Sequence, residues 1–449
     1  MLPIQKELDL ELWKKHLMAD PYLSYLYAYP HKTAYRELDP PLSLPELWEK
    51  EQGESFFLYM HIPFCAMRCG FCNLFTLPDR RDDVHEQYVA ALERQARQWA
   101  PFVSHRPASR FAIGGGTPTL LNEVLLDRLF VIAEEVMGLD LSRTSISVET
   151  SPDTVTEGRI RLLKQRTVDR VSMGIQSFTD TETTAIHRPQ KKAEVVRALE
   201  LLKQADFPIL NLDLIYGLPG QTMVSWLYSL DSAIVYEPEE IFIYPLYTRE
   251  NTFLKPEQVS ASGHDIRMDC YRAACDRLAS AGYVQYSMRR FAKPDAAPVK
   301  ELLPFSCQEE GMIGLGCGAR SYTRNVHYAS RYGVSYKATK SIIADYVATT
   351  DYTKADYGFV LNIAEQKRRF ILKAILHREG LELASYEQRF GTGALNDYPE
   401  LYLLIDSDLA QTANGILLLT DQGLAYSDAI GDWFISGEVK DLMKEHVLL

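Results

Sequence analysis

Three things are scarce in this 449-residue sequence: long apolar runs, basic charge and cysteine. No stretch approaches 18 uninterrupted apolar residues, which argues against a membrane-spanning helix. The opening residues, MLPIQKELDLELWKKH, contain neither the apolar core nor the cleavage site of a signal peptide. We therefore expect a cytoplasmic protein that has no membrane partner.

Basic residues are outnumbered, because 48 Lys and Arg residues stand against 60 Asp and Glu residues and give a formal net charge of −12. Nucleic-acid binding depends on basic patches that neutralise phosphates and release counterions. We therefore expect no nucleic-acid partner. Hydrophobic residues make up 46% of the chain, which is sufficient for a large folded core.

The seven cysteines are an odd number in a chain without a secretory signal, which argues against a disulfide framework. Three of them, Cys65, Cys69 and Cys72, lie in the stretch HIPFCAMRCGFCNLF with the spacing C-x3-C-x2-C. The other four are scattered, and we expect them to be small buried apolar residues: Cys270, Cys275, Cys307 and Cys317.

Short apolar runs alternate with amphipathic stretches between residues 56 and 248. The runs predict strands at 56–62, 109–115, 144–150, 169–175, 209–217 and 240–246. The intervening stretches predict helices at 84–100, 125–138, 192–205 and 225–236. Such alternation is typical of parallel βα units, so we expect an α/β fold, either an open sheet or a partial (β/α)6 barrel. The site is expected at the C-terminal ends of the strands.

The chain divides into four predicted parts around this pattern. Residues 1–55 are rich in Tyr and Pro and predict an N-terminal arm with one or two helices. The barrel core is expected at 56–250 and a barrel extension at 251–355, where the Gly-rich run 311–322 favours a tight structural turn over a phosphate site. Residues 356–449 predict helices and a hairpin at Asn414-Gly415, which indicates a small winged-helix-like C-terminal domain.

The cysteine triplet allows three interpretations. The thiols could simply pack in a core, but the loop also holds Pro63, Arg68 and Gly70, which do not suggest a core. A structural zinc site needs a fourth ligand, and His61 is a candidate because no second C-x2-C exists. A [4Fe–4S] cluster held by three cysteines leaves one iron open to a small chelating molecule, and we favour this interpretation.

A second motif, GGGTPT (114–119), follows the predicted strand at 109–115. Its glycines allow a ligand to approach the backbone closely. The alternative is a plain strand-to-helix turn in which Thr117 or Thr119 caps the helix. The cysteine triplet upstream makes ligand contact the better interpretation.

Together these motifs resemble the radical S-adenosylmethionine (radical SAM) family, in which C-x3-C-x2-C follows the first barrel strand. YMHIPFC, GGGTPT, VSMGIQSF, HRPQ and DLIYGLPGQT are most similar to its oxygen-independent coproporphyrinogen III dehydrogenase-like branch, over about residues 56–250. The resemblance implies that SAM chelates the open iron of the cluster. Cleavage of SAM by one electron then gives a 5′-deoxyadenosyl radical.

The resemblance also implies a set of cofactor-binding residues. Cys65, Cys69 and Cys72 correspond to the cluster ligands. The residues expected around SAM, of which one molecule or two would bind, are Tyr59, Phe71, Gly115, Gly116, Thr117, Glu149, Gln176, Arg188 and Asp213. The last three match polar residues around a second SAM. Structural alternatives are an ion pair between Arg188 and Asp213 and a strand-end role for Gln176, while Arg170 and Arg249 are expected to be surface or rim charges. No catalytic residue is identified.

Two departures from the branch weigh against porphyrinogen decarboxylation. The dehydrogenase carries a further cysteine two residues past the third ligand, where this chain has Leu74. The arm YLYAYPHKTAYR also differs, and its tyrosines could form a lid over the site or anchor the arm to the surface.

The leading prediction is a radical SAM enzyme that abstracts hydrogen and is either an oxidoreductase or a methyltransferase. In the second case, a second SAM would be the methyl donor. Alternatives are oxidative decarboxylation of the coproporphyrinogen III dehydrogenase type, a haem-binding chaperone, and a winged-helix DNA-binding regulator, which the acidic charge disfavours. The expected partners are a small-molecule substrate, such as a tetrapyrrole or a natural-product intermediate, and an electron donor such as flavodoxin or ferredoxin.

Overall fold

The computed structural model describes residues 3–23, 25–51, 55–103, 105–248, 252, 254, 265–296 and 307–446. These residues form two compact units. The larger contains Arg36–Tyr283 and Ala292–Gly358, and the smaller contains Met1–Tyr35, Val284–Phe291 and Phe359–His446. The four-part division expected from the sequence stays a prediction.

The larger unit is an α/β structure built on one sheet, whose strands run in the order β1-β15-β14-β13-β12-β2-β5-β6-β7-β8-β9. From β12 to β9 every neighbouring pair is parallel, as predicted for βα units. The six predicted strands are confirmed to within about two residues: β2 (Phe56–Ile62), β5 (Ala108–Gly115), β6 (Ser145–Thr150), β7 (Arg170–Gln176), β8 (Ile209–Tyr216) and β9 (Glu240–Pro245).

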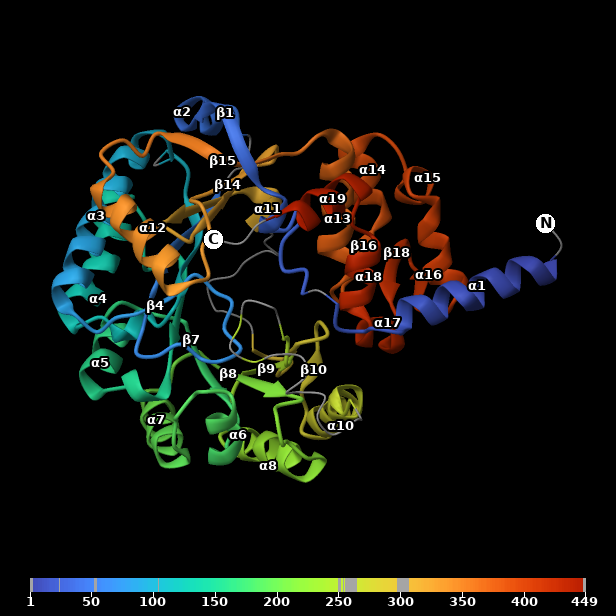
Figure 1. Ribbon diagram of the computed structural model, residues 1–449, viewed down its shortest axis with the longest axis horizontal. Helices are drawn as coiled ribbons and strands as arrows, with labels where there is room; N and C mark the ends of the chain where they lie inside the picture. Colours follow the sequence, from blue (N-terminus) through green and yellow to red (C-terminus); the bar gives the residue numbers. More distant parts are fainter. Residues whose placement is uncertain are drawn as a thin grey trace. The chain divides into compact units, whose positions relative to one another are not determined.

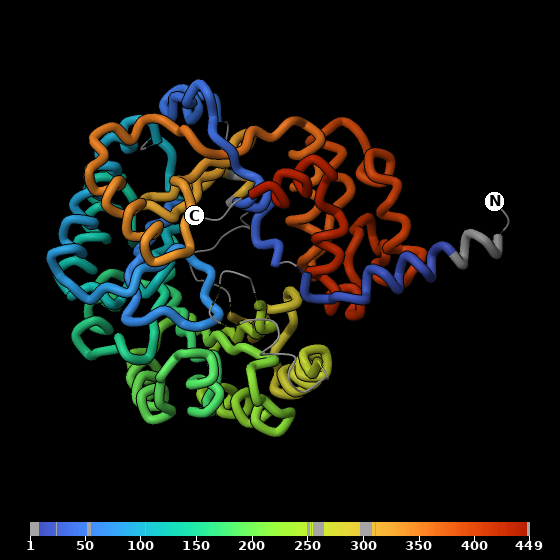
Figure 2. The backbone as a smooth tube through the Cα atoms, viewed as in Figure 1, coloured from blue at the N-terminus to red at the C-terminus, as the bar shows by residue number. Residues whose placement is uncertain are grey.

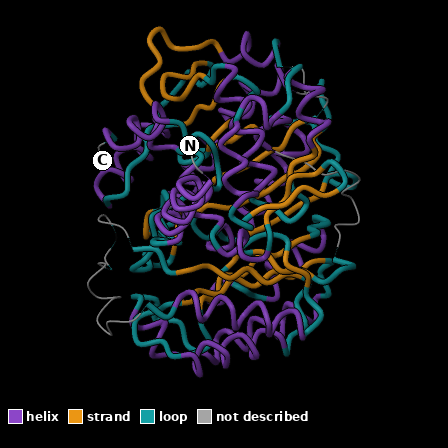
Figure 3. Tube along the Cα trace, turned by 90° about the vertical axis from the view of Figure 1, so that its right-hand side faces the viewer, coloured by secondary structure: helices purple, strands orange, loops and turns teal. Residues whose placement is uncertain are grey.

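Helices form an outer layer around these strands (Figure 1). They are α3 (Asp82–Val103), α4 (Glu123–Val131), α5 (Glu157–Gln165), α6 (Asp180–Ala185), α7 (Lys192–Ala205), α8 (Met223–Ile234) and α10 (Arg267–Ser280). In α3 the buried residues Tyr88, Leu92, Ala96 and Trp99 recur every three to four positions, so one face packs inward. Seen from the side, the lowest strands (orange) lie above such a helical layer (purple; Figure 3).

Alternation along the strands separates core from site. In β8, Leu210, Leu212 and Leu214 are buried, whereas Asn211 and Asp213 point to the opposite face because successive side chains alternate. β8 thus contributes apolar residues to one side of the sheet and polar residues to the other. This polar side, at the C-terminal strand ends, is therefore where a polar site can form.

The other elements of the larger unit are β1 (Arg36–Ser43), α2 (Leu44–Glu49), β3 (Phe64–Cys65), β4 (Leu77–Pro78), α11 (Cys307–Glu310), β12 (Met312–Leu315), β13 (Arg320–Tyr322), β14 (Val326–Ala329), α12 (Tyr336–Ala348) and β15 (Lys354–Val360). The strands β12, β13, β14, β15 and β1 extend the sheet on the β2 side, whereas β3 and β4 pair with each other in a separate sheet. The Gly-rich run is the β12–β13 hairpin, in which Gly316 and Gly318 have φ of 92° and 90°. The predicted structural turn is confirmed.

The smaller unit is mainly helical. It contains α1 (Pro3–Met18), β10 (Val284–Gln285), β11 (Arg290–Ala292, at the boundary), α13 (Ile363–Ile375), β16 (Leu381–Glu382), α14 (Leu383–Phe390), α15 (Ala394–Asp397), α16 (Tyr402–Asp406), β17 (Ala410–Ala413), β18 (Ile416–Leu419), α17 (Asp421–Ala425), α18 (Ser427–Trp433) and α19 (Gly437–Glu445). The predicted hairpin is confirmed, since Asn414 and Gly415 join β17 to β18 with φ of 52° and 79°. Trp13 of α1 packs edge-on against Trp433 of α18, with ring centroids 5.3 Å apart. In Figure 2 the blue segment of α1 runs past the red C-terminal helices of this unit.

No helix in the described part of the chain is long and apolar enough to cross a bilayer. Of the scattered cysteines, Cys270 and Cys317 are buried as expected, and Cys275 is half-buried. The side chain of Cys307 and the whole of Arg249 lie outside the described residues.

Candidate functional site

The C-terminal ends of the parallel strands surround a cavity of about 190 Å³. Eleven of the twelve predicted site residues line it: Cys65, Cys69, Phe71, Cys72, Gly115, Gly116, Thr117, Glu149, Gln176, Arg188 and Asp213. They come from segments far apart in the sequence, so the fold brings together what the motifs only suggested. Tyr59, the twelfth, does not line the cavity.

The loop that carries the three cysteines is fixed from both sides. The amide of Gly70 donates to the carbonyl of Ile186 at 2.8 Å, and the amide of Leu254 donates to the carbonyl of Gly70 at 3.1 Å. On the other side Arg68 donates to the carbonyl of Val334. Such anchoring holds the thiols in place before any ligand binds.

The thiols suit a polynuclear cluster better than a single ion. Burial and the neighbouring Cys72 raise the pKa of Cys65 to about 12, and burial raises the pKa of Cys72, so thiolates here need cations to form. Among the described residues no three His, Cys, Asp or Glu side chains converge on one ion position. In an iron–sulfur cubane each cysteine binds a different iron, so convergence on one point is not required. The donor set therefore fits a [4Fe–4S] cluster.

His61, the candidate fourth zinc ligand, is occupied elsewhere. Its Nε2 lies 3.0 Å from the carbonyl oxygen of Phe75, and its Nδ1 lies 3.2 Å from the hydroxyl of Tyr59. Because the carbonyl can only accept, Nε2 carries the proton and Nδ1 of the neutral ring accepts from Tyr59. Tyr59 thus orients His61 beneath the cavity, and neither residue forms part of its lining.

The glycine motif closes over the cysteine loop. Gly115 has φ +113°, and a Cβ there would lie 2.5 Å from the His61 ring. A Cβ on Gly116 would lie 2.5 Å from the Phe64 carbonyl oxygen and 3.0 Å from Sγ of Cys65. Only glycine permits this approach. Thr117 caps no helix with its side chain, and its hydroxyl lies 3.7 Å from Sγ of Cys65.

Glu149 stands where β6 ends, opposite this turn. The amide of Gly115 donates to Oε2 of Glu149 at 3.0 Å. Solvent reaches the side chain through the cavity, but protein surrounds it, and this burial raises the pKa of the carboxyl, as the nearby Asp213 does too. Its remaining lone pairs are available to a ligand that donates hydrogen bonds.

Asp213 is held by a small amide and hydroxyl network. Nδ2 of Asn211 donates to Oδ1 of Asp213 at 2.8 Å and to Oγ of Ser172 at 2.7 Å. Burial raises the pKa of Asp213 to about 6, although Asn211 and more distant arginines oppose this. Asn211 and Ser172 were missed from the sequence, although their period-2 positions beside Asp213 and Gly174 could have indicated them.

Gln176 reaches the cavity through a backbone irregularity. The pairing of β7 with β8 shifts between Gly174 and Gln176, and Gln176 has φ +71°. A β-bulge of this kind re-aims a side chain, and left-handed backbone at a non-glycine residue is a feature of functional sites. The bulge explains why Gln176 lines the cavity.

Arg188 donates three side-chain hydrogen bonds within the site. Nη2 donates to the Gly174 carbonyl at 2.7 Å, Nε donates to Oε1 of Gln190 at 3.0 Å, and Nη1 donates to Sγ of Cys69 at 3.3 Å. Within the described part of the chain it forms no ion pair with Asp213, so the structural ion pair allowed from the sequence is not present. Gln190, missed from the sequence, orients the guanidinium.

Arg170 was expected to be a surface or rim charge, and this expectation is wrong. Its side chain is 24% exposed and pairs with Oε2 of Glu240 at 2.7 Å. It also lies 3.3 Å from Oγ of Ser147 and 5.8 Å from the ring centroid of Phe242. Arg170 begins β7, and its partners Glu240 and Ser147 lie on the strands β9 and β6, which the charge alone did not reveal.

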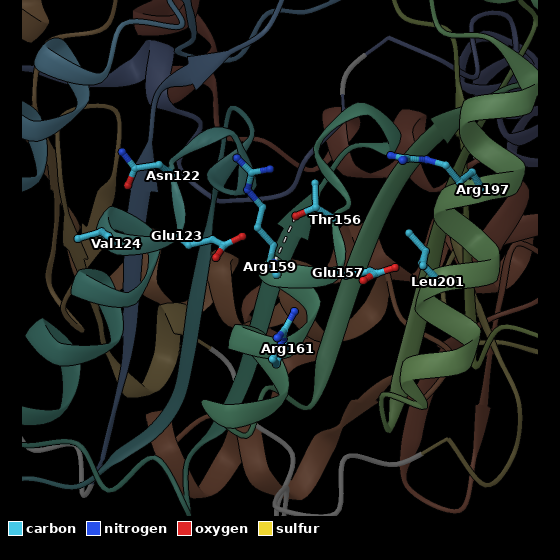
Figure 4. Close-up of a pocket in the computed structure, with 10 residues that line it drawn as sticks. Asn122, Glu123, Val124, Thr156, Glu157, Arg159, Arg161, Arg197 and Leu201 are labelled. Atoms are coloured by element: carbon cyan, nitrogen blue, oxygen red, sulfur yellow. Dashed lines mark hydrogen bonds between the residues drawn. The ribbon is translucent and has the colours of Figure 1, made fainter.

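A larger hollow of about 890 Å³ lies where α4 and α5 begin, and it shares no lining residue with the cysteine cavity (Figure 4). Asn122 and Thr156 cap these helices. Arg159 donates to the carbonyls of Leu121 and Thr154. Asn122, Thr156 and Arg159 in this hollow therefore stabilise helix ends and loops. We place the candidate functional site in the cysteine cavity.

The chain is similar to proteins of known family. Residues 59–233 match the family described as the Radical SAM superfamily. An oxygen-independent coproporphyrinogen III oxidase from Salmonella typhimurium is 25% identical over 435 residues, which cover 94% of this chain and 92% of the relative. The protein named heme chaperone HemW from Bacillus subtilis is 26% identical over 373 residues, which cover 81% of this chain and 95% of the relative.

The fold agrees with a solved structure. Coproporphyrinogen III oxidase (HemN) from Escherichia coli, described as a radical SAM enzyme, superposes with a TM-score of 0.75 at 23% identity, covering 95% of this chain and 98% of that one. This likeness shows the fold. The sequence match shows a radical SAM domain at residues 59–233.

Proposed function

We propose that this protein is a radical SAM enzyme that abstracts hydrogen from a small organic substrate. One observation carries the proposal: a single cavity collects three cysteine thiols, a glycine turn that only glycine can form, and the carboxylates Glu149 and Asp213. The match of residues 59–233 to the Radical SAM superfamily supports a [4Fe–4S] cluster and SAM as cofactors. Cys65, Cys69 and Cys72 would hold the cluster.

When bound, the cluster and SAM supply a 5′-deoxyadenosyl radical. The chain's own groups bind and orient. Backbone at Gly115 and Gly116 can lie close to a ligand because no Cβ intervenes. Glu149, fixed by the Gly115 amide, can accept hydrogen bonds from an amino group or from hydroxyls.

The substrate class is proposed from the names of the relatives. Both a coproporphyrinogen oxidase and a heme chaperone match most of this chain, so a tetrapyrrole is the first candidate ligand. Leu74, half exposed and lining the cavity, stands where the dehydrogenase has a cysteine, which disfavours porphyrinogen decarboxylation. An electron donor such as flavodoxin or ferredoxin completes the proposed reaction.

We also propose a more specific reaction, which is methyl transfer from a second SAM. Gln176 and Asp213 line the cavity and offer an amide and a carboxyl group. In the described part of the chain, Arg188 uses three of its five N–H donors within the protein. The second N–H of each Nη atom is the donor that Arg188 can offer to the carboxylate of a second ligand.

A different candidate is haem binding without turnover, supported by the relative named heme chaperone HemW, of which this chain covers 95%. The two proposals differ in their products. Stoichiometric haem binding with no 5′-deoxyadenosine formed on reduction would favour the chaperone.

The test is a product analysis under anaerobic conditions. The purified protein is reconstituted with iron and sulfide, given dithionite and SAM, and assayed for 5′-deoxyadenosine and S-adenosylhomocysteine. Deoxyadenosine alone indicates hydrogen abstraction, and both products together indicate methyl transfer. If neither forms with any candidate substrate, the enzyme proposal is wrong.

Matched variants check the ligand assignment. Cys69→Ala is expected to lose the brown cluster absorbance and all deoxyadenosine formation. Cys275→Ala removes a cysteine from α10, outside the cavity, and is expected to keep both. A full cluster in the Cys69→Ala protein would contradict the assignment.

A further inference from the structure

Arg188 lines the cysteine cavity and also contacts the sulfur atom of Cys69. Its Nη1 lies 3.3 Å from Sγ of Cys69, which is only 9% exposed. A guanidinium is permanently charged, and hydrogen bonds from a charged donor to a thiolate are strong. This contact sets Arg188 apart from an arginine that is merely waiting for substrate.

The protein fixes this geometry at three other points. The Arg188 amide donates to the carbonyl of Thr183 at 2.9 Å, and Nη2 donates to the carbonyl of Gly174 at 2.7 Å. Nε donates to Oε1 of Gln190, whose own Nε2 donates to the Ile175 carbonyl at 2.9 Å. Because Gln190 is buried, the guanidinium is held in one orientation, with Nη1 left to face Cys69.

We infer that Arg188 is a positioning residue that raises the reduction potential of the cluster through its hydrogen bond to the Cys69 sulfur. This inference rests on the proposed function, because it takes Cys69 as a cluster ligand. Reduction adds one negative charge to the cluster, and a cationic donor at a ligand sulfur stabilises that charge. Reduction potentials of iron–sulfur clusters respond to hydrogen bonds at sulfur and to nearby net charge.

The expected consequence is easier electron uptake from the donor. Removal of the hydrogen bond makes the cluster harder to reduce while leaving its three ligands in place. A ligand that drew Nη1 away from Cys69 would have the same effect, so occupancy beside Arg188 would be linked to the redox state of the cluster.

The test is potentiometric titration of the reconstituted protein without SAM, monitored by the electron paramagnetic resonance signal of the reduced cluster. Arg188→Gln is expected to lower the midpoint potential by about 59 mV, which is a tenfold change in the reduced-to-oxidised ratio of a one-electron couple. Arg188→Lys keeps the positive charge but loses the planar guanidinium with its several N–H donors. Gln190→Leu removes the side-chain oxygen that accepts from Nε of Arg188. Both are expected to fall between Arg188→Gln and the wild type.

The control separates a bond to sulfur from loss of any nearby charge. Arg80 is 65% exposed and lies 3.8 Å from Asp153, a residue of the cavity rim. Arg80→Gln removes one positive charge without touching sulfur and is expected to leave the potential unchanged. An Arg188→Gln potential equal to that of Arg80→Gln overturns the inference.

Two further outcomes are decisive. If Arg188→Gln assembles no cluster, Arg188→Lys and Gln190→Leu carry the comparison, and wild-type potentials in both overturn the inference. A wild-type protein that assembles no cluster contradicts the proposed function itself. A wild-type protein that cleaves SAM, with unshifted Arg188 variants, contradicts only the role of Arg188.

Discussion

In the smaller unit a buried charge is paired within the protein, whereas the carboxyl groups that line the cavity of the larger unit are not paired with a cation in the described part of the chain. Arg289 donates to both carboxylate oxygens of Asp428 at 2.5 and 2.6 Å and stacks 3.9 Å from the ring centroid of Tyr25. Glu149 and Asp213 have amide neighbours, but in the described part of the chain no cation is bonded to either.

This difference separates a group that maintains structure from one kept ready for a ligand. An ion pair that is satisfied within the protein has no interaction left to offer. Carboxyl groups whose pKa is raised by burial destabilise the folded protein and cluster at functional sites. We therefore expect the paired charge and the cavity carboxyl groups to respond differently to substitution.

Removal of one partner from the paired charge has the largest expected effect on stability. Asp428→Ala leaves Arg289 buried without its carboxylate and is expected to lower the free energy of unfolding by about 3–5 kcal/mol. Denaturant titration followed by circular dichroism measures the loss. A decrease below about 1 kcal/mol would mean that the pair does not hold the smaller unit together.

The unpaired carboxyl should behave in the opposite way, and its effect depends on pH. The pKa of Asp213 is raised from 3.8 to about 6, so between these values the folded protein keeps a proton that the unfolded chain loses. Stability contributed by the bound proton is therefore present below about pH 4 and lost as pH rises through about 6. Above pH 6 the loss amounts to about 3 kcal/mol.

Asp213→Asn keeps the shape and removes the titration. Unfolding free energies of the two proteins are compared from pH 4 to pH 7. The stability of the variant relative to the wild type is expected to increase as pH rises. A constant difference across this range would show that Asp213 is not held in an environment that raises its pKa.

Glu149 should matter to binding more than to folding. Glu149→Gln keeps an oxygen for the Gly115 amide but loses the charge, so stability at neutral pH is expected to stay equal or rise. The affinity for SAM, measured by isothermal titration calorimetry, is expected to fall about tenfold to a hundredfold.

Glu194→Gln is the matched control, because Glu194 also lines the cavity rim but is exposed and bonded to the Lys191 amide. Its affinity for SAM is expected to change by less than about twofold. Equal losses in both variants would remove the special role assigned to Glu149.

The smallest effect is expected where an ion pair is exposed. Arg331 and Glu37 pair across the β14–α12 loop and β1, with side chains 57% and 69% exposed. Arg331→Ala is expected to change stability by less than about 1 kcal/mol. A loss as large as that of Asp428→Ala would show that exposure does not separate the two classes.

The sequence predicted the strands well because they are apolar and separated by amphipathic helices. The predicted strand at 56–62 coincides with β2, in which five of the seven residues are buried. The pairing of β1 with β15 was not predictable, because RELDPPLS contains two prolines and no apolar alternation. Long-range antiparallel pairing leaves no local signal in such a segment.

The site was predictable from motifs, and its internal contacts were not. Cys65, Cys69 and Cys72 stand out by spacing alone, whereas the bond from Arg188 to Cys69 joins residues 119 positions apart. The bulge that brings Gln176 into the cavity arises from a register shift between two strands. Arg170 appeared to be a rim charge because its partner Glu240 lies on a different strand.

The central claim is that the three-cysteine site leaves an iron to which SAM binds. The direct measurement is the electron paramagnetic resonance spectrum of the reduced, reconstituted wild-type protein before and after addition of SAM. The account predicts a [4Fe–4S] signal whose g values change when SAM is added. A reduced cluster with an identical spectrum in saturating SAM would contradict it.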